Sequence, residues 1–592
     1  MNVMVFLLIS LIAHAIPIPY TPGMLRINRL IRWLPTRLIW GTAAWAFICL
    51  LGGMTLPWAL ITLIMSFALQ MLIVGGFRPG TIEEIIEGAR MPMMCIGLLV
   101  IIIMPVFSGL IGWTSDVANA QYVDDMIIQS NATLFESPIP DTRVRLVTQE
   151  YASFVARQQF ASIGSNIEIA AAHITTRNDR LVWVCVVVST NVLSENFIKG
   201  LIVVDANDPS MIEVLTDVQI PVGEGLFWDK NIQFGNYLND MTNAYEYAYP
   251  TWDPIGQLVY VQTRTQLGWD FVERPLGPTL YFQNGTIVSF DTIALTPHWV
   301  TQAYSEEWLE RDINRWGGYR RGDSFDLFAG GFLWAIPPSN DRLEMTEDTR
   351  YILNPDTGHV EAIIAVHPPG STSLALSGMI RATKDGIFYH DLSQEGYASG
   401  EAATNEVIKA FPNVVTGDYY GAMPLLYPVQ TGVSTYRYVW YCPIYWIDGY
   451  YDSDLEEYYI TDIRLHALGM ADAIDVTNSF TVERAGSLTG AALVKAVREG
   501  YINAIGGQVI VDPLDEVTLT ANVTSISSYV EDGDTHFVLG TTNSTFEYIV
   551  GTKSWMNLTD WYELINLQIG DNFTAHLEHV GEEYRIVAIV KN

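Results

Sequence analysis

The chain has 592 residues, of which 49% are hydrophobic and only 16% are charged. A chain of this length holds several domains, each large enough for a core of its own. The net charge of −33 argues against nucleic acid as a partner, because an acidic surface repels a phosphate backbone. Four cysteines are too few for a disulfide framework.

Residues 1–113 are apolar or carry arginine, and they form the first predicted domain. The last apolar run, Met91 to Trp113, has no charge and, at roughly 1.5 Å per residue, covers the ~30 Å hydrocarbon core of a bilayer. Apolar segments of this kind predict four transmembrane helices, at about residues 1–20, 38–55, 57–76 and 91–113.

Four arginines, at 26, 29, 32 and 37, lie between the first two apolar segments and belong in the cytoplasm by the positive-inside rule. This topology puts both termini and everything after residue 113 on the extracytoplasmic side. We therefore expect a multi-pass plasma-membrane protein in contact with membrane lipid. The alternative for the first segment is a signal peptide cleaved after Ala13–Ala15, which the missing basic n-region opposes. His14 is the only ionisable residue within the predicted spans, and this scarcity favours an anchor over an ion path.

N-x-[S/T] sequons occur only after residue 113, which agrees with an extracytoplasmic location for that part of the sequence. Each sequon alone is a weak signal, but its position is independent of the arginine pattern. The candidate glycosylation sites are Asn131, Asn284, Asn522, Asn543, Asn557 and Asn572.

An internal repeat organises the extracytoplasmic region, which follows a linker at 114–142. Arg180–Cys185 and Arg437–Cys442 share the pattern R-x-V-W-x-C, and a helix-like segment precedes each. We predict two α+β repeats with a helix on a sheet, at 143–219 and 396–480. In pattern they resemble PepSY-like and cystatin-like modules.

The repeated tryptophan and cysteine indicate core packing beneath a covering helix. The alternative is a pair of equivalent ligand or redox sites. Cys185 and Cys442 either form one bridge or remain buried thiols. The predicted repeat core, which includes a weaker echo of the pattern between the two copies, consists of Trp183, Cys185, Trp334, Trp440 and Cys442.

Residues 220–395 hold many tryptophans and tyrosines in strand-like sequence, and we expect a β-rich middle module there. A connecting helix at 481–512 follows the second repeat. Residues 513–592 read as a long strand, a hairpin, a short helix and a final hairpin. That order predicts an OB-like β-barrel.

No catalytic motif is present, so we expect no enzyme. One acidic loop has alternate carboxylates that would suit Ca²⁺, although a solvated loop explains them equally. These weak calcium candidates are Asp448, Asp452, Asp454 and Glu456. No other cofactor is expected.

The predicted fold is thus a multi-span α-helical membrane anchor joined to a large α+β, β-rich extracytoplasmic region with tandem repeats and a C-terminal barrel. The predicted function is that of a membrane-anchored scaffold or interaction protein in a larger assembly. Its partner, another protein or a second copy of the same polypeptide, is expected on the aromatic residues of 215–395, because interfaces favour tryptophan and tyrosine. The alternative is an accessory subunit of a membrane enzyme or transport complex.

Overall fold

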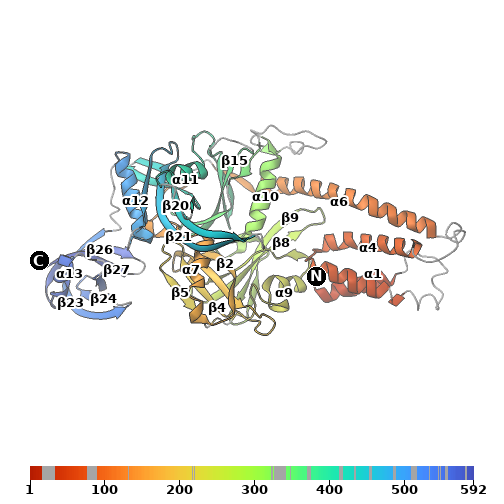
Figure 1. Ribbon diagram of the computed structural model, residues 1–592, viewed down its shortest axis with the longest axis horizontal. Coiled ribbons are helices and arrows are strands. Elements are labelled where there is room, and N and C mark those ends of the chain that lie inside the picture. The colour runs from red at the N-terminus through yellow and green to blue at the C-terminus, as the bar shows by residue number, and fades with distance from the viewer. Residues whose placement is uncertain are drawn as a thin grey trace. The chain divides into compact units, whose positions relative to one another are not determined.

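The computed structural model divides into two compact units, which are described separately (Figure 1). The first comprises Met1–Val429 and Arg437–Ala504, and the second comprises Gln430–Tyr436 and Ile505–Asn592. The structure describes the protein except for residues 17–33, 36, 77–89, 131–132, 217, 219, 322–323, 326–341, 347–348, 370–374, 412–417, 433–434, 453–456, 485–487, 508–515, 532–533, 544–545, 547, 554–555, 557, 581–582 and 592.

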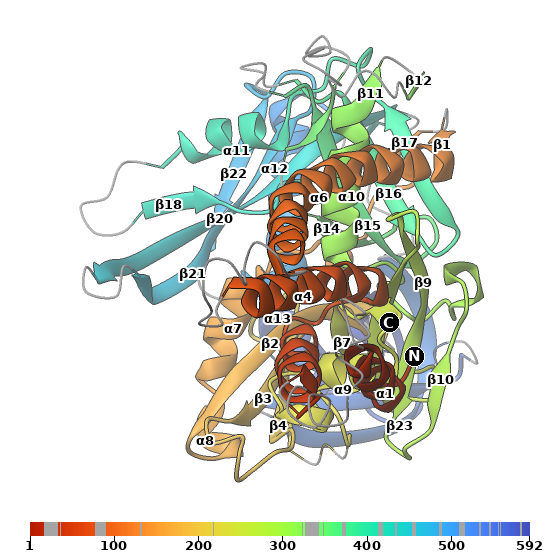
Figure 2. The ribbon, with the colours of Figure 1, turned by 90° about the vertical axis from the view of Figure 1, so that its right-hand side faces the viewer.

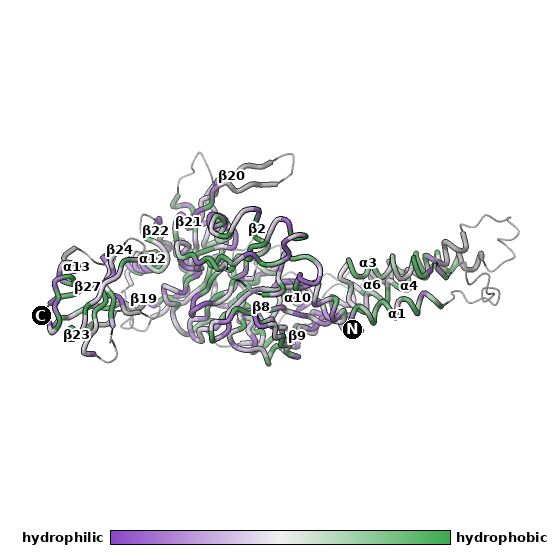
Figure 3. The backbone as a smooth tube through the Cα atoms, turned by 90° about the horizontal axis from the view of Figure 1, so that it is seen from below, coloured by the Kyte–Doolittle hydropathy of each residue, from purple (hydrophilic) through white to green (hydrophobic). Residues whose placement is uncertain are grey.

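The first unit begins with apolar helices that extend from its β-rich body, as the hydropathy colouring of Figure 3 shows. The helices α4 and α6 pack along each other (Figure 2). The elements of this part are α1 (Val3–Ala15), η1 (Ile39–Trp45), α3 (Ala46–Leu51), α4 (Leu56–Gly76) and α6 (Arg90–Met126).

Among the residues that the structure describes, no helix is both long enough and apolar enough to cross a membrane. The predicted transmembrane helices, the multi-span α-helical membrane anchor and the multi-pass plasma-membrane location are therefore wrong. The first apolar run gives a helix of 13 residues, only about 20 Å long, and the second begins as a seven-residue π-helix followed by a six-residue α-helix. The last predicted span lies in α6, which continues through Asp116, Asp124 and Asp125.

These helices are fixed to the body through the helix α9 (Ile232–Asn239) and the residues after it. The hydroxyl of Tyr237 donates hydrogen bonds to the carbonyls of Cys49 and Met54, at 3.1 and 2.8 Å. The N-terminal amine of Met1 pairs with Asp240. The apolar helices thus share one hydrophobic cluster with α9 and the residues that follow it.

The body of the first unit repeats one arrangement, in which a helix precedes an antiparallel sheet whose strands pair with their neighbours in sequence. A side chain caps the start of each helix and accepts a hydrogen bond from the third helical N–H, as stable helix starts require. Besides α9, the helices are α7 (Gln149–Arg157), α10 (Glu306–Tyr319) and α11 (Gly400–Ile408).

The helix α7 precedes β2 (Ile167–Arg177), β3 (Arg180–Ser189), β4 (Gly200–Asp205) and β5 (Ile212–Leu215). The helix α9 precedes β7 (Ala248–Trp252), β8 (Leu258–Leu267), β9 (Glu273–Phe282) and β10 (Ile287–Ser289). The helix α10 precedes β14 (Arg350–Leu353), β15 (Val360–His367), β16 (Gly378–Thr383) and β17 (Gly386–Asp391). The helix α11 precedes β19 (Leu425–Gly432), β20 (Thr435–Asp452), β21 (Glu457–Asp472) and β22 (Ser479–Glu483).

Short elements complete the first unit. β6 and β13 pair with β8 and β15, β18 pairs with β20, and β1 runs parallel to β17. Their bounds and those of the remaining elements are β1 (Ile127–Ser130), η2 (Asp141–Arg143), α8 (Phe160–Ile163), η3 (Trp228–Lys230), β6 (Asn243–Ala244), η4 (Ile293–Leu295), β11 (Arg320–Arg321), β12 (Ser324–Phe325), β13 (Glu344–Met345), β18 (Asp418–Gly421) and α12 (Gly490–Ala504).

The R-x-V-W-x-C segments lie in the second strands of two of these modules, β3 and β20. The indole of Trp183 donates to the carbonyl of Val147, immediately before the capping residue of α7. The indole of Trp440 donates to the carbonyl of Ala398, immediately before the capping residue of α11. The repeated tryptophan therefore ties the sheet to the start of the helix that precedes it.

In the second unit, five strands close in the order β23-β24-β25-β27-β26, with α13 connecting β25 to β26. Trp561 and Leu564 of α13 join its hydrophobic core. The bounds are β23 (Glu516–Glu531), β24 (Asp534–Thr541), β25 (Tyr548–Thr552), α13 (Leu558–Ile565), β26 (Asn572–Val580) and β27 (Glu583–Lys591).

Candidate functional site

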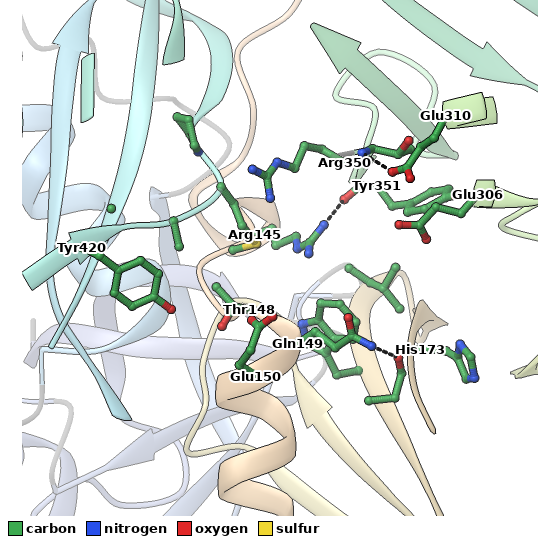
Figure 4. A pocket seen from close by; sticks show the side chains of 18 of the residues that line it. Arg145, Thr148, Gln149, Glu150, His173, Glu306, Glu310, Arg350, Tyr351 and Tyr420 are labelled. Atoms are coloured by element: carbon green, nitrogen blue, oxygen red, sulfur yellow. Dashed lines mark hydrogen bonds between the residues drawn. The ribbon is translucent and has the colours of Figure 1, made fainter. Parts of the chain in front are cut away.

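A cavity of about 1020 Å³ opens in the first unit where the starts of α7, α10 and α11 meet the strands β2 and β14 (Figure 4). Its wall also includes residues of β18 and of the segment that leads to β19. The starts of three helices from three of the repeated modules thus meet at one space, and Tyr247 of the α9 module lines it as well.

Arg145 lies in the wall of this cavity, three residues before the cap of α7, and only 6% of its surface is exposed. Its guanidinium lies over the ring of Trp183 at 4.9 Å and donates one hydrogen bond, 3.2 Å long, to the carbonyl of Tyr351. Its Nε has no hydrogen-bond partner, and Arg145 forms no ion pair within the described part of the protein. Burial, with a smaller contribution from the charge of Arg350, lowers the pKa of Arg145 to about 10.

Glu306, the first residue of α10, faces the same cavity and is half-buried. Burial, together with the charges of the nearby Glu310 and Glu307, raises the pKa of Glu306 to about 7, against smaller opposing effects of Arg145 and His173. In Figure 4, Arg145 and Arg350 lie between Glu306 and Glu310 on one side and Tyr420 on the other. The carboxyl of Glu306 therefore exchanges its proton near neutral pH beside two guanidinium groups.

A buried hydrogen-bonded network supports the opposite wall at His173 of β2. The imidazole Nδ1 of His173 contacts the hydroxyl of Tyr247 at 2.7 Å, and its Nε2 contacts the carboxylate of Glu224 at 2.5 Å. Tyr260 donates a further hydrogen bond to Glu224, 2.8 Å long. These contacts fix His173 in position, so it forms a rigid part of the wall.

The structure places the sequence-predicted core residues in two groups. Trp183 lines the cavity, whereas Trp440 and the thiols of Cys185 and Cys442 are buried in the sheets. Burial raises the pKa of Cys185 to about 12, so its thiol is unreactive. Trp334 lies outside the described residues.

Asp448, the first residue of the predicted calcium site, does not line the cavity. Asp448 is exposed on β20 and Asp452 ends that strand, while Asp454 and Glu456 lie outside the described residues. Among the side chains that the structure describes, no cluster of three potential ligands able to hold a metal ion occurs.

None of the described glycosylation candidates lines the cavity. Asn284, Asn522 and Asn572 are exposed and Asn543 is half-buried, whereas Asn131 and Asn557 fall outside the described residues. Asn572 donates a hydrogen bond to Asn522 across the strands β23 and β26.

The cavity itself was not predicted. Its charged residues are separated by more than 250 positions in the sequence, from Arg145 to Glu401, and no motif joins them. The signal that was available is a three-residue pattern, a hydroxyl residue followed two positions later by glutamate. It occurs at Thr148, Ser305 and Ser399, the capping residues of α7, α10 and α11.

Comparisons with known proteins add no family. No protein-family model matches the sequence, and no curated protein matches it. Similar solved structures include a complex of BT0996 with RGII, with 9% sequence identity over 74% of this protein and 94% of the other and a TM-score of 0.17. Another is described as "Glycoside hydrolase", with 10% identity over 68% of this protein and 94% of the other and a TM-score of 0.17. Similarities this weak support no conclusion about the function.

Proposed function

We propose that this protein binds a small ligand with an anionic group, and that Arg145 receives that group in the cavity. One observation carries the proposal: the guanidinium of Arg145 is buried beside the cavity without an ion pair among the described residues. A buried charge costs several kcal/mol unless an opposite charge and hydrogen bonds compensate it. An anion from the ligand supplies both.

The dimensions and chemistry of the cavity fit a small molecule. Ligand pockets range from about 300 to 1,000 Å³ and combine apolar or aromatic walls with a few polar groups. Here Trp183, Tyr247 and Tyr420 supply aromatic surface, while Arg145 and Arg350 supply donors. Arginine suits a carboxylate or phosphate particularly well, because its fork of N–H groups matches their oxygens.

The scaffold role expected from the sequence remains a separate prediction, but its main argument is weaker. We expected the aromatic residues of 215–395 on an interface. Many of the largest are instead fully buried, including Tyr249, Tyr260, Trp308 and Trp316. The cores of two modules therefore account for many of the aromatic residues in this part of the sequence.

The proposal is tested by measuring the melting temperature of the full-length protein in increasing sulfate and, separately, acetate. An anion that binds the folded state raises it, by the equivalent of about 2.7 kcal/mol of unfolding free energy at 100 times its Kd. The Arg145→Met variant is expected to lose this response. Without anion it should be at least as stable as the original protein, because an unpaired buried charge has been removed.

The control is Arg274→Met, which makes the same change of charge outside the cavity, at a half-buried arginine paired with Asp270. This variant should keep the anion response. Equal responses in the original protein and in Arg145→Met would overturn the proposal, as would no response to either anion in the original protein.

A further inference from the structure

Three glutamates of equivalent position surround the cavity. Glu150, Glu307 and Glu401 each stand two residues after the capping residue of a helix, in α7, α10 and α11. All three line the cavity and all three are exposed. A glutamate in the first turn of a helix is favourable by itself, because it faces the positive end of the helix dipole. That preference does not explain why three such residues converge on one space.

The fourth module provides a comparison within the same protein. Its helix α9 starts at the cap Asn231, and the position two residues later holds Gln233. Gln233 does not line the cavity; its side chain donates to the carbonyl of Glu246. The carboxylate is therefore present in the modules whose helices begin at the cavity and absent from the one whose helix does not.

The cavity has two poles of opposite charge. At its buried wall lies Arg145, with Arg350 beside it, whereas Glu150, Glu307 and Glu401 lie at the exposed rim. A ligand with negative charge alone would be repelled at this rim before it reached Arg145. A ligand with a cationic group as well satisfies both poles.

Unpaired hydroxyls in the cavity wall point to a ligand as well. Thr349, Tyr351 and Thr404 line the cavity, and none has more than 7% of its surface exposed. The side-chain oxygen of each lacks a hydrogen-bond partner within the described part of the protein. Buried polar atoms are nearly always hydrogen-bonded in proteins, so this wall offers hydrogen bonds that the protein itself does not use.

We infer that the ligand is amphoteric: a carboxylate or phosphate group pairs with Arg145, and a protonated amine lies among Glu150, Glu307 and Glu401. This inference rests on the proposed function, which requires only the anionic group. The amine donates its N–H groups to carboxylates that come from three separate modules. The repeated arrangement of the first unit thus builds one recognition site rather than three.

The experiment uses calorimetry to titrate three forms of one glycine–serine tetrapeptide into the full-length protein. The form with free ends is amphoteric, the N-acetylated form keeps only the carboxylate, and the C-amidated form keeps only the amine. The free form is expected to bind at least about tenfold more tightly than either blocked form, which corresponds to ~1.4 kcal/mol.

Two triple variants locate the effect. In Glu150→Gln, Glu307→Gln and Glu401→Gln together, the free peptide should bind no better than its acetylated form. The control variant replaces three exposed glutamates outside the cavity, Glu168, Glu395 and Glu483, by glutamine and should keep the preference for the free peptide. It makes the same change of net charge.

The outcomes separate this inference from the proposed function. Equal binding of the free and acetylated peptides would overturn the amphoteric ligand and leave anion binding by Arg145 intact. An unchanged preference for the free peptide in the cavity variant would overturn the role of the three glutamates. Absence of binding by all three forms, together with no response to sulfate or acetate, would overturn both proposals.

Discussion

Single residues in this cavity show how burial acts in opposite directions on acids and bases. Burial disfavours the charged form of each group, so it lowers the pKa of Arg145 to about 10 and raises that of Glu306 to about 7. Near neutral pH the arginine still carries its charge while the glutamate is partly protonated. The net charge of this part of the wall therefore becomes less positive as the pH rises and Glu306 loses its proton.

We expect sulfate to bind more tightly at about pH 6 than at about pH 8, by roughly three- to tenfold. Below pH 7 Glu306 is mainly neutral. Above pH 7 the ionised carboxylate of Glu306 repels the sulfate and competes with it for Arg145. By linkage, anion binding should be accompanied by proton uptake. Sulfate suits the measurement because its own charge is constant in this range.

The variant that tests this is Glu306→Gln, because the glutamine side chain is neutral at every pH. It should bind sulfate at both pH values with the affinity that the original protein has at about pH 6. Calorimetry at both pH values measures the difference. His173, Glu307 and Glu310 also face Glu306 and are unchanged in this variant. A pH dependence that persists in Glu306→Gln would assign the titration to one of them.

At the scale of elements, the junction between each helix and its sheet is repeated in detail. The indoles of Trp183 and Trp440 donate to the carbonyls that precede the caps of α7 and α11, at 2.8 and 3.0 Å. Arg180 pairs with Asp205, and Arg437 pairs with Asp472, at the ends of β4 and β21. The aspartates in turn accept backbone N–H groups of the following turns. The arginine and tryptophan of the R-x-V-W-x-C pattern thus have structural roles.

Replacing either tryptophan by phenylalanine is expected to destabilise the first unit by about 1–3 kcal/mol, because a buried carbonyl loses its donor. The two losses should be similar, since the contacts are equivalent. Urea unfolding of each variant measures them. Trp252→Phe is the control, because the indole nitrogen of Trp252 has no hydrogen bond within the described part of the protein. Unequal losses at 183 and 440 would contradict the equivalence.

At the scale of the whole molecule, the cavity belongs entirely to the first unit. Its lining residues fall between Arg145 and Pro424, and the second unit has a separate core around Phe573 and Leu539. Ligand binding therefore requires the joint folding of the modules that line the cavity, but not of the terminal strands. The described N-terminal helices do not form the expected membrane anchor, and they are fixed to the body through Tyr237.

A truncated protein that ends at Ala504 is expected to fold and to keep the sulfate response of the full-length protein within about twofold, or ~0.4 kcal/mol. The measurement is the same thermal titration, with far-ultraviolet circular dichroism to verify folding. A truncated protein that is folded but no longer responds to sulfate would show that the second unit contributes to the site.

The sequence by itself determined what depends on near neighbours in the polypeptide. A helix-like segment ahead of each copy of the repeat corresponds to α7 and α11, and the R-x-V-W-x-C pattern related two strands that occupy equivalent places. It did not determine the type of helix within an apolar run, since seven residues from Ile39 form a π-helix. Local hydropathy is the same in either arrangement.

The tertiary structure alone decided the site. Arg145, Glu306 and Glu401 belong to three of the four modules, and no local preference brings their side chains together. The same packing decides protonation, because the pKa of Glu306 depends on how much water and how many carboxylates surround it. Charge, hydrogen-bonding capacity and burial at one point in space are properties of the folded protein, so they cannot be read from the order of the residues.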